Sequence, residues 1–197
     1  LQISDLKGAL YGGEQSRLRH ALRNERCDAV VLTGDMISAL GSAEAQAIVP
    51  AVVEKIRSFA GEIIVTYDTH EGDYMDTREG RFLPVPHCIR DTEGWQLNAA
   101  VAEALSDRAY TVVEKPTFGA VTLPEVVEQL AGGEEFTVEL IGLCTDICVV
   151  SNAMLLKAAF PETDMTVDAA CCAGVSPESH QAALTTMACC QITVINN

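Results

Sequence analysis

Three residues that are distant in the sequence have the side chains needed for nucleophilic chemistry. Cys148 falls in the first turn of an expected helix that begins at Thr145 and Asp146, where the helix dipole and unpaired amides favour a thiolate. The carboxylate of Asp35 could take the thiol proton, and the ammonium of Lys115 could stabilise the thiolate and a developing oxyanion. An isolated cysteine is more often a packed core residue, so the hypothesis rests on the joint placement of the three residues.

A second group of side chains has the composition of a metal site. Asp68 and His70 alternate along an expected extended segment, so both side chains point to the same side. His87 follows a rigid, proline-containing stretch. One carboxylate and two imidazoles leave coordination positions open, as a catalytic divalent ion requires; zinc is expected, with iron and manganese as alternatives. The remaining two histidines are given other roles, His20 on a charged surface helix and His180 as a structural residue at a helix start.

Short β-branched runs alternate with longer helical patterns, which predicts strands joined by helices in a parallel sheet. Six strands are expected, at Ala29–Thr33, Ile63–Thr66, Tyr110–Val113, Val138–Ile141, Met165–Val167 and Ile192–Ile195. Six helices are expected, at Glu14–Arg23, Pro50–Phe59, Gln96–Leu105, Pro124–Leu130, Asp146–Phe160 and Pro177–Cys189.

The expected fold is a three-layer αβα, Rossmann-like arrangement around a six-stranded parallel sheet. In such a sheet, ligands bind beyond the carboxyl ends of the strands, and Asp35, Asp68 and Lys115 each follow an expected strand. The region 68–94 interrupts the alternation, and a loop of this length in a compact domain is usually functional or disordered. No linker is visible, so we expect one domain over residues 1–197, with a segment of unknown role at 1–28.

The composition narrows the classes of partner. Among 197 residues there are 28 acidic and 13 basic side chains, which give a net charge of -15, so nucleic acid and anionic membranes are poor partners. The chain has eight cysteines but no CxxC pair, which argues against zinc ribbons and thioredoxin-like motifs. Its start resembles neither a secretory signal nor a membrane anchor. We therefore expect a soluble, cytoplasmic protein that binds a small molecule.

Five motifs in the chain have a characteristic order. They are Asp35-Met36, Asp68-Thr69-His70, Pro86-His87-Cys88-Ile89 followed by Thr92-Glu93-Gly94, the run Glu114–Gly119 and the run Gly142–Val149. In this order they resemble the isochorismatase-like cysteine hydrolase superfamily, and more closely its nicotinamidase-related amidases. The resemblance covers about residues 28–197.

This resemblance implies a catalytic triad of Asp35, Lys115 and Cys148. It also implies a cis peptide bond between Leu143 and Cys144. The backbone amides of Cys144 and Cys148 would then shape an oxyanion hole.

The same resemblance implies that Asp68, His70 and His87 bind a divalent metal ion. The implied activity is the hydrolysis of nicotinamide, or a similar small carboxamide, to the acid and ammonia through a thioester. Such a reaction belongs to NAD salvage and pyridine nucleotide biosynthesis. A homo-oligomer is compatible with the resemblance.

The chain departs from the family pattern at two places. The segment after Met36 is shorter than usual and lacks the phenylalanine that helps to clamp the substrate ring. Thr69 stands where many nicotinamidases have tryptophan. Either the pocket is remodelled or the sequence omits a loop. In a remodelled pocket, we expect Tyr74 or Phe118 to supply a replacement wall, with Trp95 as a further aromatic side chain.

Two rival functions remain on the same scaffold. One is a cysteine hydrolase that acts on a different, non-pyridine amide, which the missing aromatic clamp would suit. The other is a binding protein without catalysis, because a fold alone does not establish a reaction. An isochorismatase proper would be expected to lack the metal ligands Asp68, His70 and His87.

Overall fold

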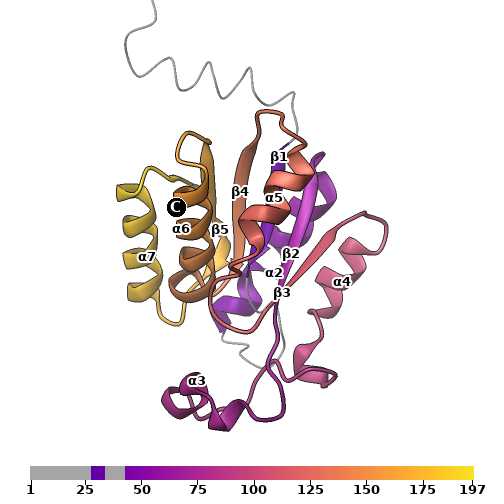
Figure 1. Ribbon diagram of the computed structural model, residues 1–197, viewed down its shortest axis with the longest axis vertical. Coiled ribbons are helices and arrows are strands. Elements are labelled where there is room, and N and C mark those ends of the chain that lie inside the picture. The colour runs from indigo at the N-terminus through magenta and orange to yellow at the C-terminus, as the bar shows by residue number, and fades with distance from the viewer. Residues whose placement is uncertain (1–27, 34–42) are drawn as a thin grey trace, which may run out of the picture.

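The computed structural model describes residues 28–33 and 43–197, and the remaining residues are not discussed structurally. Six strands form one sheet in the order β3-β2-β1-β4-β5-β6, and all neighbouring strands are parallel (Figure 1). This parallel pairing agrees with the predicted alternation of strands and helices. The strands are β1 (Asp28–Thr33), β2 (Glu62–Asp68), β3 (Thr111–Lys115), β4 (Thr137–Leu143), β5 (Met165–Ala173) and β6 (Thr193–Ile195).

Helices cover both faces of this sheet, and alternate residues of each strand point to opposite faces. Ile64 packs toward α5, α6 and α7, whereas its neighbours Ile63 and Val65 pack toward α2 and α4. Two apolar cores therefore lie on either side of the sheet. The α-helices are α2 (Ala43–Ser58), α3 (Arg78–Phe82), α4 (Ala99–Leu105), α5 (Leu123–Ala131), α6 (Val150–Ala159) and α7 (Pro177–Cys189).

The start of α2 differs from the sequence prediction. Pro50 suggested a helix start, but the helix begins at Ala43 and contains the proline. The loss of one backbone hydrogen bond at proline is tolerated because the apolar spacing continues on its amino-terminal side, where Ala45 and Ile48 are buried against the sheet. The expected helix Glu14–Arg23 lies outside the described residues.

The region 68–94, expected to be a functional loop, has short helices of its own. The 3-10 helices Tyr74–Asp76 and Glu93–Trp95 flank α3 on its two sides. Figure 1 shows α3 lying beyond the sheet, connected to the end of β2. Within the described part of the chain, no helix has the length and apolar character needed to cross a membrane.

A group of charged side chains joins α2 to the middle of the sheet. The ammonium of Lys55 lies 2.6 Å from a carboxylate oxygen of Glu139 and 2.9 Å from one of Asp168. Burial would raise the pKa of Asp168, but hydrogen bonds from Lys55 and Asn196 outweigh it and hold this pKa below its ordinary value. Lys55 thus compensates two carboxylates, of which Asp168 is almost completely buried.

We expect Lys55→Met to lower the free energy of unfolding by about 3 kcal/mol at neutral pH, because it leaves a buried carboxylate without its cation. The wild-type contribution is present above the ordinary carboxyl pKa and is lost as pH falls through the lower native pKa of Asp168. The difference between the two proteins should therefore shrink below about pH 4. Urea unfolding of both proteins, from neutral pH to below about pH 4, measures this difference in the free energy of unfolding.

The matched control is Lys157→Met, since the ammonium of Lys157 donates to the backbone carbonyls of Pro161 and Thr163. Lys157→Met should lower the free energy of unfolding by less than Lys55→Met does, and by the same amount at each pH. An equal, pH-independent loss in both variants would contradict the proposed role of Lys55.

Candidate active site

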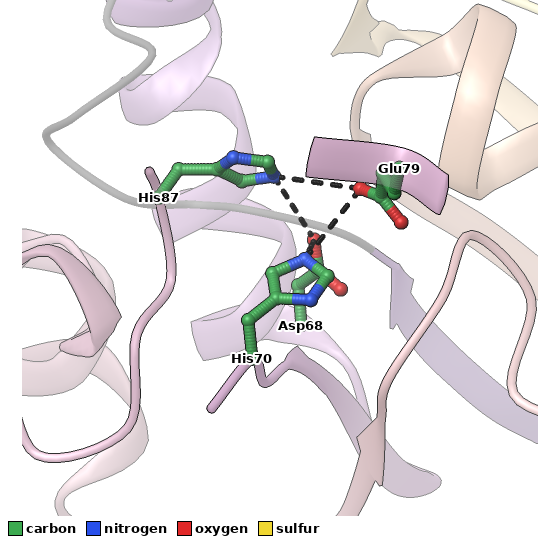
Figure 2. Close-up of side chains that lie close together, drawn as sticks. All are labelled: Asp68, His70, Glu79 and His87. Atoms are coloured by element: carbon green, nitrogen blue, oxygen red, sulfur yellow. Dashed lines mark ion pairs between the residues drawn. The ribbon is translucent and has the colours of Figure 1, made fainter. Parts of the chain in front are cut away.

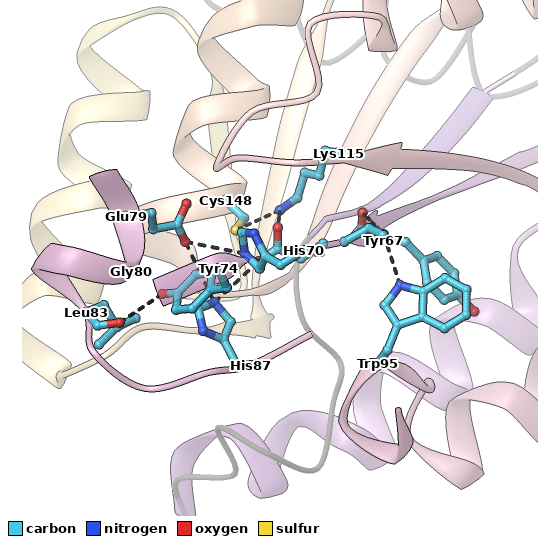
Figure 3. A network of polar contacts seen from close by, with 12 residues as sticks. Tyr67, His70, Tyr74, Glu79, Gly80, Leu83, His87, Trp95, Lys115 and Cys148 are labelled. Atoms are coloured by element: carbon cyan, nitrogen blue, oxygen red, sulfur yellow. Dashed lines mark hydrogen bonds and ion pairs between the residues drawn. The ribbon is translucent and has the colours of Figure 1, made fainter. Parts of the chain in front are cut away.

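A buried lysine connects the predicted nucleophile with the predicted metal ligands. The ammonium of Lys115 lies 2.9 Å from Oδ1 of Asp68 and 3.4 Å from Sγ of Cys148 (Figure 3). Lys115 is 0% exposed, and Asp68 and Cys148 are buried as well. A buried ammonium is costly unless anionic or polar groups compensate it. The carboxylate and the thiolate form of Cys148 are well suited to do so.

Four side chains in this region form a compact set of potential metal ligands. They are the three predicted residues Asp68, His70 and His87, together with Glu79, and one ligand atom of each lies within 4.8 Å of the others (Figure 2). Nε2 of His70 lies 3.5 Å from both Oδ2 of Asp68 and Oε1 of Glu79. Two imidazoles and two carboxylates are a donor set that suits zinc, iron or manganese. The chemistry of the described residues thus fits a divalent ion.

The predicted nucleophile is carried by a π-helical turn, Thr145–Val149, directly after β4. The carbonyl of Cys144 accepts hydrogen bonds from the amides of Ile147 and Val149, each at 3.1 Å. The peptide bond between Leu143 and Cys144 is cis, which confirms the expectation at this position. Wide turns of this kind are frequent at functional sites. The oxyanion hole formed by the amides of Cys144 and Cys148 stays a prediction.

A family model, the isochorismatase domain, matches residues 33–197 of this chain. The chain belongs to the isochorismatase family. Its predicted family membership and α/β fold are thereby confirmed, and the protein is a hydrolase of this family. No curated protein sequence gives a significant match.

This chain matches solved structures with the same fold over almost the whole length of those structures. A nicotinamidase/pyrazinamidase from Bacillus subtilis has a TM-score of 0.72 at 23% identity, covering 86% of this chain and 99% of the other. A pyrazinamidase of Pyrococcus horikoshii, in complex with zinc, has a TM-score of 0.69 at 20% identity. The match covers 87% of this chain and 100% of the pyrazinamidase. An N-carbamoylsarcosine amidase from Thermoplasma acidophilum has a TM-score of 0.65 at 23% identity, covering 86% and 95%.

In this isochorismatase-family protein, strand register places the polar groups side by side. Lys115, the last residue of β3, pairs with Asp68, the last residue of β2. The amide of His70 donates to the carbonyl of Cys88, and the amide of Arg90 donates to the carbonyl of His70, both at 2.9 Å. These two bonds hold the segment that carries His87 beside the end of β2.

The side chain of Arg90 reinforces this pairing. Its guanidinium forms a two-point contact with Glu114, at 3.1 and 2.8 Å, and donates to Glu71 at 2.9 Å. Glu71 follows His70, and Glu114 precedes Lys115. Arg90 thus connects the segments that carry the metal ligands and the buried lysine.

Glu79 was not identified from the sequence, and local packing explains how it reaches the cluster. Thr77 caps α3 by accepting a hydrogen bond from the amide of Gly80 at 3.0 Å. A side chain at position 80 would clash with the backbone, because a Cβ there would lie 2.0 Å from the carbonyl oxygen of Tyr74. The close approach that glycine permits brings α3, and with it Glu79, against the histidines. The signal in the sequence was a threonine able to cap a helix, with a glutamate two positions and a glycine three positions later.

The pKa of Asp68 reflects its surroundings. Burial would raise this pKa, but the hydrogen bond with His70 and the positive charge of Lys115 outweigh burial and lower it. Asp68 is therefore an anion at neutral pH, as a metal ligand must be.

The two aromatic residues expected at the pocket have different environments. Tyr74 is buried, with its ring 4.7 Å from that of His70 and 5.0 Å from that of His87, and its hydroxyl donates to the carbonyl of Leu83. It therefore supports both histidines. Phe118 is 45% exposed on the loop after β3. Its contact with substrate stays a prediction.

Thr69, which stands where many nicotinamidases have tryptophan, makes a side-chain hydrogen bond with Trp95. Its hydroxyl accepts a hydrogen bond of 3.0 Å from the indole of Trp95, whose ring packs edge-on against Tyr67 at 5.7 Å. Figure 3 shows Trp95 directed away from Cys148. The predicted base, Asp35, and the segment after Met36 lie outside the described residues.

We expect the purified protein to bind one divalent ion per chain, and the double variant His70→Ala with His87→Ala to lose it, because two of the four donors are removed. Glu79→Gln should weaken binding by about 10- to 100-fold, as losses around metal sites typically do. Glu93→Gln, an exposed acidic position in the same region, is the control and should bind like the wild type. Elemental analysis and chelator competition measure both effects. Unchanged metal content in the double variant would rule out this site.

Proposed function

We propose that this protein is a metal-dependent cysteine amidohydrolase that converts nicotinamide, or a similar small carboxamide, to the acid and ammonia. The observation that carries this proposal is the position of the Lys115 ammonium between Sγ of Cys148 and the carboxylate of Asp68. Family membership and the likeness to solved nicotinamidases and pyrazinamidases support it. With nicotinamide as substrate, the reaction would belong to NAD salvage.

In the first half of the proposed reaction, Cys148 is acylated. Asp35 takes the proton of the thiol, and Sγ adds to the carbonyl carbon of the amide. Lys115 lies beside the sulfur, where its positive charge favours the thiolate and stabilises the developing oxyanion together with the backbone amides of Cys144 and Cys148. The carbon–nitrogen bond then breaks, and the proton held by Asp35 passes to the leaving nitrogen to give ammonia.

In the second half, water hydrolyses the thioester. Asp35 takes a proton from the water, whose oxygen adds to the acyl carbon, and the carbon–sulfur bond breaks. The proton returns to the sulfur of Cys148 and the carboxylic acid leaves. One carboxylate thus acts alternately as base and acid.

Asp68, His70, Glu79 and His87 would hold the divalent ion. When bound, this ion supplies a Lewis acid that orients the ring nitrogen of a pyridine carboxamide. Zinc is our first choice, since its preferred ligands are present, and the Pyrococcus relative was solved with zinc.

A second candidate is a hydrolase of the same mechanism that acts on a non-pyridine amide. It is favoured by Thr69, which stands where many nicotinamidases have tryptophan and whose hydroxyl accepts a hydrogen bond from Trp95. The likeness to an N-carbamoylsarcosine amidase agrees with a broader range of amides on this scaffold.

We expect Cys148→Ala to reduce ammonia release from the best substrate by a factor of about 10³ or more, because the covalent route is lost. Cys189→Ala removes an exposed thiol at the end of α7 and should leave the rate unchanged. Ammonia release, measured with metal content for each variant, tests this. Near-normal turnover of Cys148→Ala would show that the nucleophile is assigned wrongly.

The substrate is tested with nicotinamide, pyrazinamide, benzamide and N-carbamoylsarcosine. We expect the pyridine and pyrazine amides to be preferred over benzamide, which lacks a ring nitrogen. If Phe118 stacks on the ring, Phe118→Ala should raise KM by about 2- to 12-fold, since an aromatic contact contributes about 0.5 to 1.5 kcal/mol. A preference for N-carbamoylsarcosine over all ring amides would instead support the second candidate.

A further inference from the structure

His180 and Thr145 meet next to the turn that carries Cys148. Nδ1 of His180, in the first part of α7, lies 2.8 Å from the hydroxyl oxygen of Thr145. Thr145 is fully buried and is the first residue of the π-helical turn Thr145–Val149. A residue distant in sequence therefore contacts the beginning of the segment that presents the sulfur.

The connection between β5 and α7 holds His180 in place. Ser176 caps α7 with a reciprocal hydrogen-bond pair that includes Ser179. Gly174 approaches so closely that a Cβ at this position would lie 2.8 Å from Cβ of His180. His180 therefore packs closely against the backbone of Gly174, with little free space between them.

A second contact joins the same two segments. The amide of Val175 lies 3.2 Å from each carboxylate oxygen of Asp146, the residue after Thr145. Two successive residues of the turn are thus held: Thr145 by His180 of α7, and Asp146 by Val175 of the connection before α7. Burial lowers the pKa of His180, although the charge of Asp146 opposes this effect, so the imidazole is neutral at neutral pH.

In the proposed mechanism, the reactivity of Cys148 depends on its distance from Lys115. Sγ of Cys148 lies 3.4 Å from the ammonium of Lys115, which comes from a different strand. Small displacements of a reacting group cost large factors in rate, about 10²-fold for 1 Å in some enzymes. A contact that fixes the start of the turn also limits displacement of the sulfur.

We propose that His180 is a positioning residue which, through the Thr145 hydroxyl, holds the turn Thr145–Val149 so that Cys148 stays beside Lys115. This inference rests on the proposed function, in which Cys148 is the nucleophile. The alternative is that the contact stabilises the fold without affecting the thiol.

The test compares two pairs of variants. His180→Leu and Thr145→Val each remove the polar contact, whereas His180→Asn and Thr145→Ser keep a polar atom near its place. We expect the first pair to lower both kcat and the rate at which iodoacetamide alkylates Cys148 by about tenfold. KM and metal content should change by less than about twofold, since substrate and metal contacts remain. His180→Asn and Thr145→Ser should recover most of both rates.

The double variant His180→Leu with Thr145→Val should be no slower than either single variant, because both remove the same contact. Met187→Ala, a core change in the same helix, is the control for lost stability and should lower Tm without lowering either rate. Peptide-resolved mass spectrometry separates Cys148 from the other cysteines. Thr145→Val preserves side-chain shape and keeps the test available if His180→Leu does not fold.

Wild-type alkylation and kcat in Thr145→Val and His180→Leu, with only a lower Tm, would overturn the proposal. The alkylation assay contains no substrate, so it also separates this inference from the proposed function. A wild-type protein that hydrolyses none of the amides, but whose Cys148 alkylation depends on His180, would contradict the proposed substrates and support the positioning role.

Discussion

The site depends on a lysine ammonium that is withdrawn from water. Complete burial of Lys115 would cost several kcal/mol if its charge were not compensated. Asp68 and Cys148 lie within reach of its nitrogen and supply that compensation. Because Asp68 also belongs to the cluster of metal ligands, one cation connects the group proposed to hold the metal with the group proposed to attack the substrate. A change in either partner must alter the electrostatic environment of the other.

The parallel sheet makes this arrangement possible. Its strands end at one edge, so β2 contributes Asp68, β3 contributes Lys115, and the turn after β4 contributes Cys148. None of these strands could hold the three groups alone. The segments that follow the strands then determine the geometry. Arg90 connects the segment after β2 to Glu114 of β3, and His180 contacts the turn after β4.

The sequence predicted the groups whose positions follow from strand order and periodicity. Lys115, Asp68 and His70 stand at or just beyond strand ends, where a parallel sheet gathers polar residues. Glu79 could not be predicted in this way, because its position depends on the packing of Gly80 against the Tyr74 carbonyl. The early start of α2 was missed for a related reason: burial of Ala45 and Ile48 outweighs the local preference of Pro50. In both cases the position depends on tertiary packing.

The most direct test of the proposed nucleophile is whether the sulfur of Cys148 bonds to the carbonyl carbon of a substrate analogue. Pyridine-3-carboxaldehyde, labelled with ¹³C at its carbonyl, has no leaving group, so addition of the thiolate stops at a tetrahedral adduct. We expect the labelled carbon to give the ¹³C NMR signal of a thiohemiacetal with the wild-type protein, and only the signals of the aldehyde and its hydrate with Cys148→Ala. An aldehyde that binds the wild-type protein without forming a thiohemiacetal, or a thiohemiacetal that persists in Cys148→Ala, would contradict the assignment of Cys148 as the nucleophile.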